Sequence, residues 1–162
     1  MKKRFTLIFL ALSLQFLCFE LVFAAADVVS VTRTRVTQPS PSARGIDKIT
    51  YTFSSTDADA ERAAARSIAS VFGTIVKFHY IPGAVNTPDA GADIRVYSAL
   101  TGGIDLLFSA CDNVGATETV GFPAHATTLR PAFMAGDTLY FSATDLGAGT
   151  NDGVLYVWIL SP

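Results

Sequence analysis

The chain is poor in the residues on which most catalytic, metal-binding and disulfide-stabilised proteins depend. Its 162 residues include two cysteines, two histidines and one tryptophan, and only 16% of them are charged. Two cysteines cannot form a disulfide framework. The 12 lysines and arginines are spread along the chain and give no patch dense enough to hold nucleic-acid phosphates. We therefore expect no nucleic-acid partner.

Only one cysteine is expected in the folded protein. Cys18 lies in an N-terminal segment that we expect to be removed, so Cys111 has no partner for an internal disulfide. A lone thiol in an exported protein is either buried as a small apolar group or paired between chains. We expect Cys111 to be buried.

Residues 1–26 have the three parts of a secretory signal peptide. Residues 2–4 are basic, residues 5–19 form a largely apolar run, and residues 24–26 are alanines that suit cleavage. The prediction is an exported protein, periplasmic, extracellular or at the cell surface. Cleavage after Ala26 starts the mature chain at Asp27, and cleavage after Ala24 is the alternative.

The alternative for residues 1–26 is an uncleaved membrane anchor. The apolar stretch is long enough to cross a bilayer, but Gln15 and Glu20 make it a poor span. We expect contact with a membrane only if this segment is retained.

The remainder of the chain has the length of one domain. From Asp27 onward it carries nine basic and thirteen acidic residues, a net charge of −4. Residues 27–45 form an N-terminal strand or arm followed by a linker rich in proline and serine. An edge strand of the main sheet and an arm that pairs with a neighbouring subunit both stay open here. Residues 46–162 form the main domain.

The clearest strand in the main domain is residues 74–81, which are rich in Ile, Val, Phe and Tyr and end at a Pro-Gly pair. Alternation along this strand predicts that Val76, Phe78 and Tyr80 face the core, with Ile75, Lys77, His79 and Ile81 on the other side.

Other segments repeat the two-residue alternation of a strand. They are residues 46–54, 92–98, 104–110, 137–144 and 153–160. Short turns predict two hairpins, one joining 92–98 to 104–110 and one joining 137–144 to 153–160. Residues 120–135 contain two prolines and can hold only an edge strand. The whole pattern predicts an all-β protein, an antiparallel β-sandwich or jelly roll of about seven to eight strands with at most one short helix.

Local signals conflict only over residues 57–72. Asp57 suits a helix N-cap, and the alanines that follow favour helix. On these residues we predict a short helix over 59–67. The apolar stripe of that helix would be mostly alanine, which gives it little to bury.

The candidates for catalysis are few. His79 lies within a strand and His125 in a Pro-Ala loop, and neither has an acid at a helpful spacing along the chain. We predict that the protein is not an enzyme and needs no cofactor. A small secreted hydrolase is the rival hypothesis, and it requires one of these histidines to lie in a pocket beside an acid.

Metal ligation has slightly more support. Carboxylates in loops are ligands of Ca²⁺ type, and the weak candidates are Asp89, Asp93, Asp145 and Asp152. Their spacing matches no calcium loop, and Asp is an ordinary turn residue. We therefore predict turn chemistry and no metal site.

Two aromatic residues of the last strand are weak candidates for ligand binding. Tyr156 and Trp158 share one face and would make a sugar-stacking platform if that face were exposed. The continuous apolar run of this strand favours the alternative interpretation, burial on both sides.

A series of short motifs resembles a family of small proteins encoded in tailed-phage and prophage genomes beside virion structural genes. The motifs are Ile49-Thr50-Tyr51-Thr52-Phe53, Gly73-Thr74-Ile75-Val76, Ile81-Pro82-Gly83, Thr87-Pro88-Asp89, Asp93-Ile94, Gly103-Ile104-Asp105-Leu106-Leu107, Pro131 with Ala135-Gly136-Asp137-Thr138-Leu139, and Gly153-Val154-Leu155-Tyr156. They span about two-thirds of the chain and mark turns and core positions.

This resemblance implies a β-sandwich that decorates or completes an assembly and performs no chemistry. It also implies loop and strand over residues 57–72, against the helix predicted above. The export signal and residues 27–44 have no counterpart in that family.

We therefore expect a non-enzymatic structural or decoration subunit of virion type that associates with itself or with a phage or surface assembly. The alternative is an exported β-sandwich module that binds a carbohydrate or another surface ligand.

Overall fold

The computed structural model describes residues 28–37, 45–56, 67–124 and 133–161. All the regular structure in these residues is β-strand, which confirms the predicted all-β class. The strands are β1 (Val28–Thr37), β2 (Ile46–Ser55), β3 (Ser67–Pro82), β4 (Asp93–Tyr97), β5 (Thr119–Gly121), β6 (Phe133–Thr144) and β7 (Asn151–Leu160).

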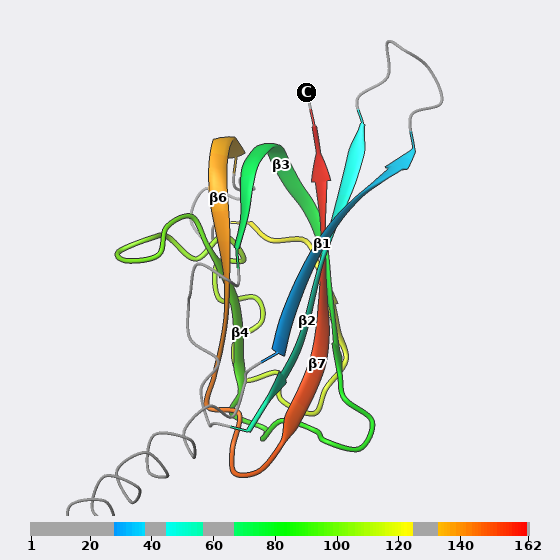
Figure 1. Cartoon of the computed structure of the whole chain (residues 1–162), viewed down its shortest axis with the longest axis vertical. Coiled ribbons are helices and arrows are strands. Elements are labelled where there is room, and N and C mark those ends of the chain that lie inside the picture. Colours follow the sequence, from blue (N-terminus) through cyan, green and yellow to red (C-terminus); the bar gives the residue numbers. More distant parts are fainter. Residues whose placement is uncertain (1–27, 38–44, 57–66, 125–132, 162) are drawn as a thin grey trace, which may run out of the picture.

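The seven strands form one antiparallel sheet that is folded into two layers. The strand order is β1-β2-β7-β3-β6-β4, and β5 pairs with β3 beside this path. Figure 1 shows β1, β2 and β7 in one layer, β4 and β6 in the other, and β3 curving over between them. A sheet that turns back on itself in this way can bury its inner face without any helix.

Strand β3 belongs to both layers because its two halves have different neighbours. Its first half pairs with β6 and its second half with β7 and β5. The ladder with β6 is irregular near Val71, and Gly73 has a φ of 121°. A Cβ at Gly73 would lie 2.2 Å from the carbonyl oxygen of Leu160. Glycine is therefore required where the strand bends from one layer to the other.

Aromatic rings join the two layers across the core. The ring of Phe141 on β6 lies 5.3 Å from those of Tyr51 and Phe53 on β2. β2 and β6 are not neighbours in the sheet, so these contacts show that the layers face each other. Each such ring pair contributes about 0.5–1.5 kcal/mol beyond the burial of its area.

The predicted alternation is confirmed in β2, β4 and β7. Each of these strands places one set of alternate side chains in the core: Ile49, Tyr51 and Phe53; Ile94 and Val96; Leu155, Val157 and Ile159. Cys111 is also fully buried, as predicted.

The predicted phase of β3 is wrong in its first part. Phe78 and Tyr80 face the core as expected, but so does Ile75, whereas Val76 is only partly buried. The register with β7 shifts between Ile75 and Lys77. A bulge adds one residue to the strand, and this reverses the side on which the preceding side chains lie.

Both predicted hairpins need correction. The return of the first is a single bridge between Tyr97 and Asp105, after which residues 106–113 form a series of turns. The second does not form, because β6 and β7 lie in different layers with β3 between them in the sheet. Their connection crosses from one layer to the other.

Three further predictions fall wholly or partly outside the described residues. The signal peptide and His125 lie outside them, as does the helix predicted over 59–67 apart from Ser67, with which β3 begins. Residues 67–72 are strand, as the resemblance implied. In the stretch predicted to hold only edge strand, β5 is three residues long and pairs with β3 alone.

Candidate functional site

The solvent-facing side of the first layer carries a group of aromatic and basic side chains. We call this group the outer face, and it consists of Lys48, Thr50, Lys77, His79, Tyr156 and Trp158. The register places Trp158 between Lys48 and Lys77, and Tyr156 between Thr50 and His79. Strand β7 is central, with its inner side chains buried and these outer ones partly exposed. The interpretation that β7 is buried on both sides is therefore wrong.

The aromatic rings of the outer face are neighbours. The rings of Tyr156 and Trp158 have centroids 5.8 Å apart, and the His79 ring lies 6.1 Å from that of Tyr156. Residues two apart on a strand share a face, so the alternation of β7 brings the two larger rings together. The sequence placed this pair correctly but not its exposure.

Each lysine of the outer face lies over a ring. Lys48 Nζ is 4.9 Å from the centroid of Tyr156, and Lys77 Nζ is 5.0 Å from that of Trp158. Such a cation–π contact is worth about 0.5–1 kcal/mol at an exposed site. Among the described residues, no carboxylate forms an ion pair with either lysine. Within the described part of the chain, both ammonium groups are therefore held at rings and not at carboxylates.

His79 does have an acidic partner, which sequence analysis missed. His79 Nε2 lies 2.6 Å from Glu118 Oε1, although the two residues are 39 positions apart. Glu118 immediately precedes β5, whose pairing with β3 brings it beside His79. The His79 side chain is 21% exposed and that of Glu118 is 61% exposed, so the pair lies on an open surface.

One edge of the sheet is formed by β1, and nothing in the described part of the chain pairs with its free side. β1 is ten residues long, and its side chains from Thr32 to Val36 are exposed. Its backbone groups on that side are open to another strand.

Arginines hold β1 against β2 from the core side. Arg33 Nη2 and Arg35 Nε lie 2.5 and 2.7 Å from the carboxylate of Asp47, which is 2% exposed. The Ser161 hydroxyl donates to the same carboxylate over 2.8 Å. Burial alone raises the pKa of Asp47, but these hydrogen bonds and charges outweigh it and hold that pKa below its usual value.

The opposite edge, formed by β4, is covered by residues 104–113. The amide of Ile94 donates to the carbonyl of Cys111 over 2.9 Å, and the amide of Leu106 donates to the carbonyl of Val96 over 2.7 Å. The backbone groups on the outer side of β4 are thereby used by the chain itself.

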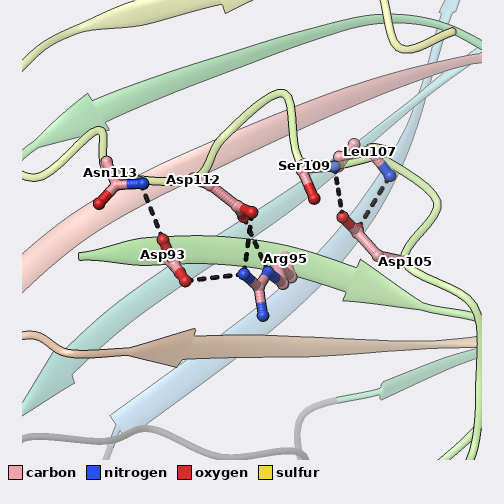
Figure 2. Close-up of polar contacts among 7 residues, drawn as sticks. All are labelled: Asp93, Arg95, Asp105, Leu107, Ser109, Asp112 and Asn113. Carbon is pink, nitrogen blue, oxygen red and sulfur yellow. Dashed lines mark hydrogen bonds and ion pairs between the residues drawn. The ribbon is translucent and has the colours of Figure 1, made fainter. Parts of the chain in front are cut away.

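Ion pairs fix this covering segment on β4 (Figure 2). Arg95 donates to both oxygens of Asp112, over 2.8 and 2.9 Å, and to Asp93 over 2.7 Å. Asp93 in turn accepts from the amide of Asn113 over 2.8 Å. Hydrogen bonding to Arg95 holds the pKa of Asp112 below its usual value.

Asp105 shapes the turn within the same segment. Its carboxylate accepts from the amides of Leu107 and Ser109 over 3.0 and 2.7 Å (Figure 2). Burial raises the pKa of Asp105 although these bonds oppose the change. Burial also raises the pKa of Cys111 to about 12, with the charges of Asp105 and Asp112 adding to the effect. The thiol is therefore held neutral at physiological pH.

The four weak metal candidates are occupied in other ways or lie apart. Asp93 binds Arg95, and Asp152 accepts from Asn86 Nδ2 over 2.7 Å. Asp89 lies against Gly147, and Asp145 is an exposed residue with a φ of 56°. In the described residues, no three His, Cys, Asp or Glu side chains gather as metal ligands would.

An open depression of about 330 Å³ lies at one end of the outer face. It is lined by residues of β2, the β3 end and the start of β7, including Thr52, Ile81 and Val154. These three residues continue the rows of Thr50, His79 and Tyr156 along their strands. His79 is not among its described lining residues.

The described residues include no helix of the length and hydropathy that a membrane span requires. Comparison of the whole chain with protein-family models, with curated proteins and with solved structures gives no match. The resemblance to phage virion proteins therefore stays a prediction.

Proposed function

We propose that this protein is an exported, non-enzymatic structural subunit that assembles through the free edge of β1. The observation that carries the proposal is the difference between the two edges of the sheet. One edge is covered by residues 104–113 of the same chain, whereas no described residue pairs with the free side of the ten-residue strand β1. A long free edge is a template for a strand of another chain.

The side chains of β1 are compatible with such pairing. Inward-pointing charges can block an edge strand, because a partner cannot bury them. In β1 the charges of Arg33 and Arg35 are turned back to Asp47 within the same subunit. The exposed residues of the strand include Thr32, Thr34 and Val36, whose residue types favour β structure.

The occupant that we propose for this edge is β1 of a second copy. Antiparallel pairing of identical strands gives a two-fold interface in which each edge satisfies the other. The first layer would then run continuously through two subunits. A decoration subunit of this kind works by filling a place in an assembly, which agrees with the virion family that the sequence resembles.

Light scattering on the protein expressed from its full gene in a bacterium tests this proposal. Mass spectrometry of the same sample locates the start of the chain and so tests the export signal. We expect a dimer or a larger multimer of defined size, and a double variant Thr32→Lys/Thr34→Lys should be monomeric. With the two-fold axis at Arg33, position 32 of one copy lies opposite position 34 of the other, and like charges facing each other destabilise a ladder.

The matched control is Thr52→Lys, which alters an exposed threonine on the neighbouring strand β2. It should leave the multimer intact. A wild-type protein that stays monomeric up to its solubility limit would refute assembly through β1.

A second function is favoured by a separate observation. The partly exposed rings of Tyr156 and Trp158 on the outer face support an exported module that binds a carbohydrate or another surface ligand. This function needs no second copy, because the outer face is complete within one chain. A folded Trp158→Thr variant that no longer binds glycan would support it.

A further inference from the structure

The lysines of the outer face give it a charge opposite to that of the whole protein. The chain has a formal net charge of −2. The outer face carries the positive charges of Lys48 and Lys77, and no carboxylate of the described residues pairs with them. A basic area on an acidic protein is complementary to an anionic partner.

The positions of the two ammonium groups determine which ligands can use the rings. Lys48 and Lys77 lie over the rings of Tyr156 and Trp158, so a sugar that stacks on a ring has to displace an ammonium group. A neutral sugar offers the displaced ammonium group only hydroxyl oxygens as hydrogen-bond acceptors, which bind it more weakly than a carboxylate. A sugar that carries a carboxylate gives each lysine an ion pair in exchange for the lost ring contact.

The register of β7 with β2 and β3 allows a sugar to stack on a ring and to form an ion pair with a lysine. Trp158 is the direct cross-strand partner of Lys48 on one side and of Lys77 on the other. Neighbouring strands are about 4.8 Å apart, so the two lysine backbones lie about 10 Å from each other with the Trp158 ring between them. Aromatic rings with a lysine on each neighbouring strand suit a polymer in which apolar sugar faces and carboxylates recur.

We propose that the outer face binds an acidic polysaccharide, with sugar rings on Tyr156 and Trp158 and carboxylates on Lys48 and Lys77. This inference rests on the second function proposed above. The depression beside Val154 continues the same face along β7, but Asp152 is among its lining residues, so we place the acidic polymer at the Trp158 end of the face.

The same features do not favour a nucleic acid. Aromatic side chains flanked by cations can stack bases, but tight binding of a strand needs several phosphate contacts. Lys48 and Lys77 are the only lysines from Asp27 onward, and Glu118 adds a negative charge beside His79. Single-stranded DNA is therefore the competing ligand in the test.

The test measures binding of the protein from its full gene to polygalacturonate, alginate and hyaluronate, each beside its methyl-esterified form. Esterification removes the carboxylate charge and keeps the polymer backbone. We expect binding to at least one of the acidic polymers and a loss of at least about tenfold in affinity on esterification. Raising the salt from about 20 to about 150 mM should weaken binding further.

Variants then assign the contacts. Trp158→Thr and the double variant Lys48→Gln/Lys77→Gln should each weaken binding by at least about tenfold. The double variant Lys48→Arg/Lys77→Arg should retain binding, because arginine keeps the charge. Phe72→Thr is the matched control, since Phe72 is an exposed aromatic of β3 whose ring lies by Gly136 on β6 and not on the outer face. Circular dichroism checks that each variant is folded.

The possible outcomes of the binding measurements test the acidic-ligand inference and the second function separately. Equal binding of acidic and esterified polymers would overturn the acidic-ligand inference and leave the second function standing. No binding to any of the six polymers would overturn both. Tighter binding of oligo(dT) than of every polysaccharide would overturn the inference in favour of a nucleic acid. The dimer test through β1 is independent of all three.

Discussion

The two edges of the sheet differ, because the chain covers the β4 edge and no described residue covers the β1 edge. At the β4 edge, residues 104–113 fold back and use the backbone groups of the strand, and Arg95 holds them in place through Asp93 and Asp112. At the β1 edge, the ion pairs of Asp47 lie on the core side and leave the strand's outer backbone groups unused. Ion pairs therefore hold a covering segment on the β4 edge, whereas at the β1 edge they only hold β1 against β2. A chain that covers one edge and leaves the longer one open is suited to pairing with one second copy, as proposed above.

The largest effect on stability is expected at Gly73, where β3 bends from one layer of the sheet to the other. Gly73→Val places a side chain 2.2 Å from the carbonyl of Leu160 at a φ of 121°. We expect a loss of about 3 kcal/mol or more in the free energy of unfolding, measured by urea denaturation. Val76→Ala is the control, because Val76 is only partly buried in the same strand. A Gly73→Val protein as stable as the wild type would contradict the proposed role of this bend.

A smaller effect is expected when the covering segment of β4 is released. Arg95→Met leaves Asp93 and Asp112 without their cation, and both carboxylates are mostly buried, at 16% and 20% exposure. We expect a loss of about 2–3 kcal/mol in unfolding free energy.

The fully buried thiol of Cys111 reports opening of this segment directly. Labelling of Cys111 by a thiol reagent at pH 8 should be slow in the wild type, because the thiol is buried and its pKa is raised to about 12. Labelling should be faster in Arg95→Met and unchanged in Arg33→Met, which alters only the β1 side. Equal rates in all three proteins would show that Arg95 does not hold the segment closed.

The smallest effect is expected from acid, which acts on both edges at once. Asp47 and Asp112 have pKa values below the usual 3.8 in the folded protein. Their contribution to stability is therefore complete above pH 3.8 and is lost as the pH falls through the lower folded-state values. Asp105 acts in the opposite direction, because its raised pKa makes its charged form a cost that low pH removes.

We expect the urea midpoint to fall between about pH 4 and about pH 2 in the wild type. The fall should be smaller in Arg95→Met, because Asp112 then loses the bond that lowers its pKa. An equal fall of the urea midpoint in the two proteins would show that the acid sensitivity does not come from Asp112. Asp47 at the β1 edge would then be the next group to test.

Alternation in the sequence was sufficient to predict several strands but not their neighbours. In β2, Ile49, Tyr51 and Phe53 alternate with polar residues and the ladder is regular, so the core face follows directly from the residues. In β7 alternation also separates two faces, but the residues of both faces are largely apolar. In β3 a bulge between Ile75 and Lys77 changes the phase, and no residue type announces it. The hairpin predicted between β6 and β7 assumed that adjacent segments pair, whereas their connection crosses between layers.

The candidate sites differ in the same way. Tyr156 and Trp158 share a face by local geometry, so their proximity could be predicted. Whether that face was exposed depended on what packs against it, and the apolar composition of β7 suggested burial. The contact between His79 and Glu118 joins residues 39 positions apart, and no local spacing could reveal it.

The sequence alone determined the all-β class, the inner faces of β2, β4 and β7, and the burial of Cys111. These depend on the period of the strand and on hydrophobicity, which are properties of short segments. The tertiary structure decided the bend of β3, the covered and open edges, and the exposure of the aromatic pair. Those depend on which distant segments meet, because backbone hydrogen bonds between strands and contacts between layers are made across the whole chain.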